Sequence, residues 1–390
     1  MFNEHEFWTL AKVCSFHSLN PRMDRLKERE NVLKLTLKSQ YGGQIPIGSP
    51  SWNDLQSRIS IYFETFETVT DKLKRQKKPE VLSIADCKHN LILTLEACLT
   101  SYKYPVAKSY QEAVKKWLHQ VIHDEEIICV PYDLGNFVFK TYYLTDDLEV
   151  TCLEEVKKMS NSEATTGLIT WQGALGMHQY ISGQDEFCKF QQILELGSGA
   201  GLLGLSLLKS MRNIESYTFT DISPTVLDTI NANLSINYEL PHQVENWILD
   251  GAPEIINASN LYQNIQRRVK NSEGHEQQVN VRFLDWLNAS DELLKSIDYD
   301  VIIGSDLTYT ISMLLPLAEL LKRLLKLKEK HVEAWIACTQ RGSDSIAIFL
   351  THLKEVGLEY SLASQFTLSL NNVISHEPLH KVFIYKIQCK

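Results

Sequence analysis

The pattern of hydrophobic and polar positions changes character about a third of the way along the chain. Residues 1–130 repeat apolar and charged positions at helical spacing and contain no glycine-rich ligand site, which predicts a mainly helical N-terminal domain. Beyond them, apolar runs of strand length alternate with helical patterns, which is typical of an α/β domain. We therefore expect two domains, residues 1–130 and residues 131–390.

Strand patterns also mark the two ends of the second domain. Residues 136–144 and 148–156 are expected to pair around a Thr-Asp-Asp turn near the domain junction, and residues 380–387 form a closing strand. Between them, residues 250–278 are rich in Asn, Gln and charge. We interpret this polar insertion as a flexible loop.

The segment ILELGSGAGLLGLSLLKS, residues 193–210, reads as a strand, a glycine turn and a helix. Gly199, Gly201 and Gly204 match the dinucleotide fingerprint G-x-G-x-x-G, but two residues separate Gly199 from the strand. The register that begins at Gly197 instead has Glu195 at the strand end. A carboxylate there suits the ammonium group of S-adenosylmethionine, and glycines let a ligand approach the backbone. A dinucleotide and a purely structural turn remain alternatives.

Carboxylates also follow the next strand patterns. Asp221 ends the strand 217–221 and lies 20 residues after Gly201 (221 − 201), the distance at which an acid reaches ribose hydroxyls. It is also placed to cap the following helix. Asp285 and Trp286 end the run 279–286 and are candidates for contacting an adenine. Because the carboxyl ends of parallel strands meet at one edge of a sheet, we expect these acids to converge on one crevice.

Together these motifs resemble the seven-β-strand methyltransferases. The matching segments are Glu195-Leu-Gly-Ser-Gly-Ala-Gly, Asp221, Leu284-Asp285-Trp286, Asp306-Leu-Thr-Tyr309 and Thr166-Gly-Leu-Ile-Thr-Trp171. The last two resemble the group that modifies protein lysines, and most closely the branch that methylates a lysine of translation elongation factor 2 (the family 86 lysine methyltransferases). The resemblance covers roughly residues 160–345. The insertion at 250–278 departs from the family, whose connection there is usually shorter.

The resemblance implies a Rossmann-like, seven-stranded sheet with helices on both faces, and S-adenosylmethionine as cofactor. It implies a protein substrate, elongation factor 2, with Asp306 and Tyr309 orienting its amine. The implied cofactor-binding residues are Trp171, Glu195, Gly197, Ser198, Gly199, Gly201, Asp221, Asp285, Trp286 and Ser305. Another translation or chaperone protein as the substrate, and a non-catalytic cofactor-binding scaffold, are the alternatives. Methylation of adenine in nucleic acid is disfavoured, because Asp-Leu-Thr-Tyr replaces the Asp-Pro-Pro-Tyr type of loop.

Composition and charge restrict the kinds of partner and the cellular location that we expect. A formal net charge of −9 disfavours binding nucleic acid directly through phosphate contacts. No apolar run reaches the ~20 residues needed to span a membrane, and the first residues are acidic where a secretory signal is basic. The eight cysteines include no C-x-x-C pair, as suits reduced thiols. We therefore expect a cytoplasmic monomer without membrane association.

A zinc-protease pattern, H-E-x-x-H, occurs at residues 376–380. Zinc binding requires both histidines on one face of a continuous helix. Pro378 lies between them and would remove a helical hydrogen bond. We therefore predict a loop here, and no metal site.

Overall fold

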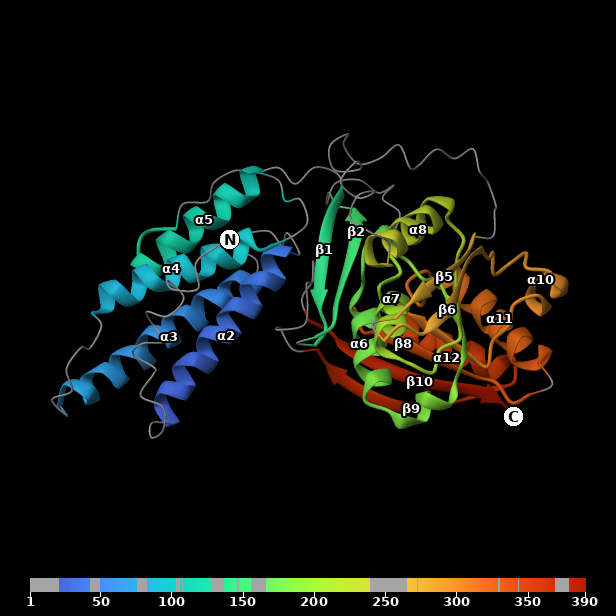
Figure 1. Cartoon of the computed structure of the whole chain (residues 1–390). Coiled ribbons are helices and arrows are strands. Elements are labelled where there is room, and N and C mark those ends of the chain that lie inside the picture. The colour runs from blue at the N-terminus through green and yellow to red at the C-terminus, as the bar shows by residue number, and fades with distance from the viewer. Residues whose placement is uncertain are drawn as a thin grey trace. The chain divides into compact units, whose positions relative to one another are not determined.

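The computed structural model describes residues 21–42, 50–75, 83–102, 106, 108–127, 137–145, 147–155, 166–238, 265–271, 273–328, 330–342, 344–368 and 379–390 (Figure 1). The chain divides into two compact units, Met1–Leu134 and Gly135–Lys390. Residues 250–264 of the polar insertion and residues 376–378 of the H-E-x-x-H pattern lie outside the described residues. None of the described helices is both long enough and apolar enough to cross a membrane.

The first unit is helical, as the sequence predicts. Its described helices are α2 (Pro21–Gly42), α3 (Pro50–Arg75), α4 (Ile84–Thr100) and α5 (Lys108–His123). Along α3, buried Trp52, Leu55 and Ile59 recur at helical spacing, so one face of the helix packs inward. Trp52 meets Trp117 of α5 edge-on, with ring centroids 4.7 Å apart. Aromatic pairs of this geometry stabilise a helix interface beyond the area they bury.

The second unit begins with the predicted hairpin. Strands β1 (Phe137–Tyr143) and β2 (Glu149–Glu155) pair antiparallel. Their buried face carries an ion pair, with the Nζ of Lys140 3.1 Å from the Oε2 of Glu154. The hydroxyl of Tyr142 donates to Oε1 of the same carboxylate at 2.6 Å. A buried charge is tolerated when it is both paired and hydrogen-bonded, as Glu154 is here.

The main sheet of the described chain has eight strands in the order β5-β6-β4-β3-β7-β8-β10-β9. Strands β6, β4, β3, β7 and β8 are parallel, and the outer strands are antiparallel to their neighbours. The strand order reverses between β3 and β7, where open α/β sheets bind ligands. The bounds are β3 (Gln192–Leu196), β4 (Ser216–Asp221), β5 (Ile265–Lys270), β6 (Glu276–Phe283), β7 (Val301–Ser305), β8 (Glu333–Thr339), β9 (Leu358–Thr367) and β10 (Lys381–Cys389).

Seven of these strands form the expected Rossmann-like sheet, and β5 is an eighth. The loop prediction for the polar insertion is wrong over residues 265–270 and 276–278, which form β5 and the start of β6. The reason is that β5 is an edge strand with one solvated face. Gln266, Arg268 and Lys270 are exposed while Val269 is buried, so the segment is polar overall although it is paired.

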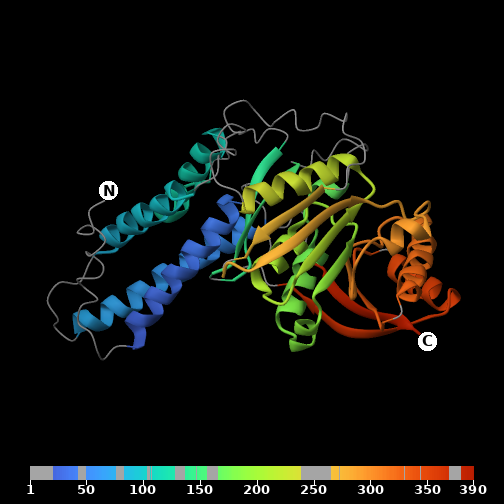
Figure 2. The same ribbon diagram turned by 45° about the vertical axis from the view of Figure 1, so that its right-hand side comes forward.

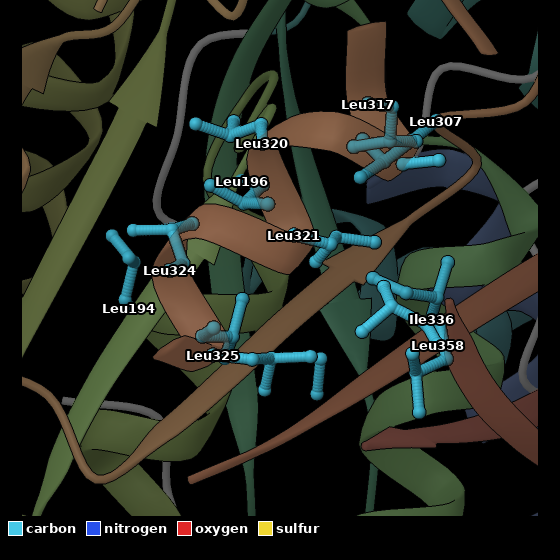
Figure 3. Close-up of a cluster of buried hydrophobic side chains, with 14 of the residues drawn as sticks. Leu194, Leu196, Leu307, Leu317, Leu320, Leu321, Leu324, Leu325, Ile336 and Leu358 are labelled. Atoms are coloured by element: carbon cyan, nitrogen blue, oxygen red, sulfur yellow. The ribbon is translucent and has the colours of Figure 1, made fainter. Parts of the chain in front are cut away.

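Helices cover both faces of the sheet (Figure 2). One face contacts α6 (Gln172–Ser182), α7 (Leu202–Ser210) and α8 (Pro224–Tyr238). The other contacts α11 (Leu314–Leu327) and α12 (Ser345–Glu355), beside the short α10 (Asp291–Lys295). Under α11 the core is aliphatic: leucines of that helix lie against Leu194, Leu196 and Ile336 of the sheet (Figure 3).

Two asparagines of α8 anchor the hairpin. The side chain of Asn233 accepts from the backbone N–H of Leu153 at 2.7 Å and donates to the carbonyl of Ala200 at 2.9 Å. One turn later, Asn237 accepts from the N–H of Thr151 at 3.2 Å and donates to its carbonyl at 2.7 Å. These amides give β2 the hydrogen bonds that a neighbouring strand would otherwise supply.

We expect Asn233→Ala to lower the free energy of unfolding of the α/β unit by about 1–3 kcal/mol, because buried backbone groups of β2 lose their partner. Asn231→Ala, in the same helix, is the matched control, since the side-chain oxygen of Asn231 has no hydrogen-bond partner among the described residues. Thermal melts of both variants decide the matter. Equal midpoints would contradict the anchoring role.

Candidate active site

The glycine turn after β3 is held against β4 by two hydrogen bonds between Ser198 and Thr220. The N–H of Ser198 donates to the carbonyl of Thr220 at 2.9 Å, and the N–H of Thr220 donates to the Ser198 hydroxyl at 3.1 Å. Gly197 and Gly199 have φ values of 57° and 53°, a region that favours glycine. Gly201 is the N-cap of α7. The turn therefore presents bare backbone at the carboxyl end of the sheet.

A cavity of about 290 Å³ opens at this edge of the sheet. That volume lies near the small end of the range for small-molecule sites, about 300–1,000 Å³. Of the predicted site residues, eight line it: Trp171, Gly197, Gly199, Asp221, Trp286, Ser305, Asp306 and Tyr309. Residues that the prediction did not name also line it, namely Thr166, Gly167, Ile222, Ser223, Leu307, Thr310 and Met313. No group of three or more metal-binding side chains occurs in the described part of the chain.

Four predicted residues are absent from this lining: Glu195, Ser198, Gly201 and Asp285. Glu195 is buried below the turn and accepts a hydrogen bond from the Tyr217 hydroxyl at 2.9 Å. Burial raises the pKa of its carboxyl to about 8. The carboxylate of Asp285 accepts from the N–H of Leu287 at 2.9 Å and from the side chain of Asn288 at 2.7 Å. Asp285 thus stabilises its own turn and leaves Trp286 on the cavity wall.

Asp221 both hydrogen-bonds the glycine turn and lines the cavity. Its carboxylate accepts from the N–H of Gly199 at 3.3 Å and from the N–H of Ser223 at 3.0 Å. Ser223 directly precedes α8, so a helix starts where the sequence indicates, but Asp221 accepts these hydrogen bonds from the turns before the helix and not from its first-turn N–H groups. Burial raises the pKa of this carboxyl.

Asp306 follows β7 with a φ of 53°, unusual for a residue with a side chain. Its Oδ2 accepts from the N–H of Gly173 at 2.8 Å, the hydroxyl of Thr339 at 3.0 Å and the guanidinium of Arg341 at 3.0 Å. Its Oδ1 accepts from the N–H of Thr339 at 2.8 Å. One carboxylate therefore joins the start of α6 to the end of β8 and the segment after it.

Arg341 also touches the aromatic wall of the cavity. Its guanidinium carbon lies 4.8 Å from the ring centroid of Trp171, and the indole N–H of Trp171 donates to the carbonyl of Thr166 at 2.8 Å. Thr170 hydrogen-bonds Glu154 of the hairpin at 2.5 Å. The Thr-Gly-x-x-Thr-Trp segment is thereby fixed at both of its ends. Nothing in the spacing of the sequence marks Arg341, which is an isolated arginine after a strand.

A family model described as lysine methyltransferase matches residues 153–257 and 248–356, together more than half of the chain. The chain belongs to the lysine methyltransferase family. It is 26% identical over 274 residues to protein-lysine N-methyltransferase EEF2KMT of Bos taurus, covering 66% of this chain and 74% of that protein. It is 23% identical over 245 residues to protein-lysine N-methyltransferase EFM3 of Saccharomyces cerevisiae, covering 60% and 61%.

An uncharacterised Dictyostelium discoideum protein is 26% identical over 337 residues, covering 84% of this chain and 88% of that protein. Among solved structures, Pyrococcus horikoshii TYW2 in complex with MeSAdo covers 80% of this chain and 86% of that chain at 11% identity. Its TM-score is 0.36, too low to support an argument about this chain.

This lysine methyltransferase uses S-adenosylmethionine, and its cavity fits that cofactor. A Cβ on Gly197 would lie 2.6 Å from the side chain of Leu307, and a Cβ on Gly199 would lie 3.3 Å from the carbonyl of Gly167. Both glycines also have positive φ values, so a residue with a side chain would be strained at either position. The carboxylate of Asp221 and the ring of Trp286 share the same lining, so an acceptor and an aromatic surface are both available to a nucleoside.

We expect Gly173→Ala to lower the rate of methyl transfer at least about tenfold, since misplacing a positioned group by about 1 Å can cost 100-fold. A Cβ at Gly173 would lie 2.7 Å from the Asp306 carboxylate and push it aside. Gly183→Ala at the other end of α6 is the control, because a Cβ there meets its nearest atom at 3.6 Å. Single-turnover rates with circular dichroism on the same samples test this, and equal rates would refute it.

The raised pKa of Glu195 makes stability depend on pH. In the folded protein the carboxyl keeps its proton up to about pH 8, against a usual value of 4.5. The favourable contribution of this carboxyl to the free energy of unfolding is therefore complete below pH 4.5 and is lost as the pH rises through about 8. We expect the free energy of unfolding of Glu195→Gln, relative to that of the parent protein, to rise by roughly 1–4 kcal/mol as the pH is raised from 6 to 9. A pH-independent difference in the melting temperatures of the cofactor-free proteins would contradict this.

Proposed function

We propose that this lysine methyltransferase methylates a lysine of translation elongation factor 2. The motif resemblance to that branch supports the proposal, as do the relatives named EEF2KMT and EFM3. We further propose that it works in the cytoplasm as a monomer and does not bind nucleic acid directly, in keeping with its formal charge of −9. The helical unit and the methyltransferase unit are proposed as its two domains.

The cofactor supplies a methyl group already activated on a sulfonium. The protein therefore has to bind, to align the amine and to exclude water. Asp221 is proposed to accept from the ribose hydroxyls, and Trp286 to flank the adenine. The remaining proposed cofactor-binding residues are Trp171, Glu195, Gly197, Ser198, Gly199, Gly201, Asp285 and Ser305. Four of these eight line the cavity, and the others act from behind the turn or beside the wall.

The lysine proposal rests on how hydrogen bonds are distributed over the two oxygens of the Asp306 carboxylate. Three donors occupy its Oδ2, while Oδ1 accepts one hydrogen bond among the described residues. A carboxylate oxygen has two lone pairs, so Oδ1 retains room for a donor arriving through the cavity. Tyr309, at the cavity mouth, is the proposed second contact.

A lysine must lose its proton before it can attack, although its usual pKa is near ~10.4. Leu307 and Met313 are apolar wall residues of the cavity, and an apolar wall disfavours the ammonium form. The guanidinium of Arg341 pairs with Asp306, which reduces the tendency of that carboxylate to hold a charged lysine. Together these groups favour a neutral, oriented amine.

Purified enzyme with labelled cofactor should place label on a lysine of elongation factor 2, read by mass spectrometry. Asp306→Asn should lower kcat and kcat/KM together by about one to two decades, because a charge-assisted contact is lost. Tyr309→Phe should cost less, since its ring remains. Cofactor affinity should change little in both variants.

Label on a different translation or chaperone protein would redirect the substrate assignment. Cofactor binding without transfer to any protein would indicate a scaffold. If Asp306→Asn lowered only thermal stability and left the rate per folded molecule unchanged, Asp306 would be structural alone.

A further inference from the structure

Exposed apolar side chains lie in, and directly beside, the segments that line the cavity. Outside the helical unit, the described chain exposes six large hydrophobic side chains, and Leu362 alone lies away from these segments. The other five form what we call the apolar collar: Ile222, Leu287, Tyr309, Ile311 and Leu315. Ile222 and Tyr309 line the cavity, and each of the others lies within two residues of a lining residue.

The collar is also free of charge. Residues 222–227, 286–290 and 307–318, which carry its five members, contain no Asp, Glu, Lys or Arg. In the cavity itself, Asp306 pairs with Arg341 and keeps acceptor room on Oδ1 for one amine, and Asp221 accepts from the backbone of Gly199 and Ser223. The five collar side chains themselves carry no charge, so apolar side chains of a partner would be removed from water on them.

Exposed apolar side chains gathered beside a site mark a place where a partner binds. A target lysine must pass through the mouth of the cavity, so the residues beside it in the substrate lie on the collar. We infer that the collar binds the substrate segment that carries the target lysine, and that this segment has apolar side chains on both sides of the lysine. The inference rests on the proposed lysine methylation and names the kind of sequence that it selects.

The test uses the full-length enzyme and purified elongation factor 2. Leu287→Ser combined with Ile311→Ser removes two collar side chains that are 60% and 59% exposed and have no proposed role in catalysis. We expect KM for the protein substrate to rise about tenfold, with kcat within about twofold and cofactor affinity unchanged, as for loss of contacts made equally in ground and transition states. Leu362→Ser, on β9 and 48% exposed, is the matched control and should change none of these.

A second measurement does not depend on any variant. Contact through the apolar collar predicts that KM of the unmodified enzyme changes less than about threefold between 50 and 300 mM NaCl, because screening acts on charges. A steep rise of KM with salt, or an unchanged KM in the double variant, would overturn the inference. So would a methylated site, mapped by mass spectrometry, that is flanked only by charged residues.

Failure of the proposed function gives a different result. If the unmodified enzyme does not methylate elongation factor 2, the substrate assignment fails. The apolar collar is then tested with the unmodified enzyme, the double variant and Leu362→Ser, using as substrate the lysate protein that the unmodified enzyme labels. Loss of labelling in the double variant but not in Leu362→Ser would still support it, and equal labelling would overturn it.

Discussion

The carboxylate of Asp306 is the contact on which the arrangement of the site depends. It accepts hydrogen bonds from Gly173 at the start of α6, from Thr339 at the end of β8 and from Arg341 beyond it. These positions are distant in the chain, and a buried charge that needs several donors ties them to one point at the edge of the sheet. The left-handed backbone at Asp306 aims the carboxylate at them, at an energetic cost that the bonds offset.

A second buried carboxylate, Glu154, performs a similar task on the other side of Trp171. It accepts hydrogen bonds from Lys140, Tyr142 and Thr170, and so connects the hairpin to the segment that ends at Trp171. The aromatic wall of the cavity is thus supported through two carboxylates that solvent barely reaches. Such support limits the motion of a group that must face both a cofactor and an amine.

The sequence predicted those features that local patterns encode. The glycine turn, the acids at strand ends and the parallel strands follow from spacing and periodicity, and the structure places eight of the twelve predicted site residues on one cavity. Local patterns in the sequence could not predict the role of Arg341 or the clash that requires glycine at position 173, since both depend on contacts between segments more than 30 residues apart. Strand β5 was missed because an edge strand with a solvated face has the composition of a loop.

The position of β5 has a consequence for how this chain can vary. The strand is added outside β6, at the border of the sheet, and pairs with β6 alone among the described strands. Residues gained or lost between α8 and β5 therefore need not change the register of β3, β4 and β7, because the entropy of closing a loop grows only slowly with its length. This border is where the chain tolerates changes of length, and the catalytic edge is insulated from them.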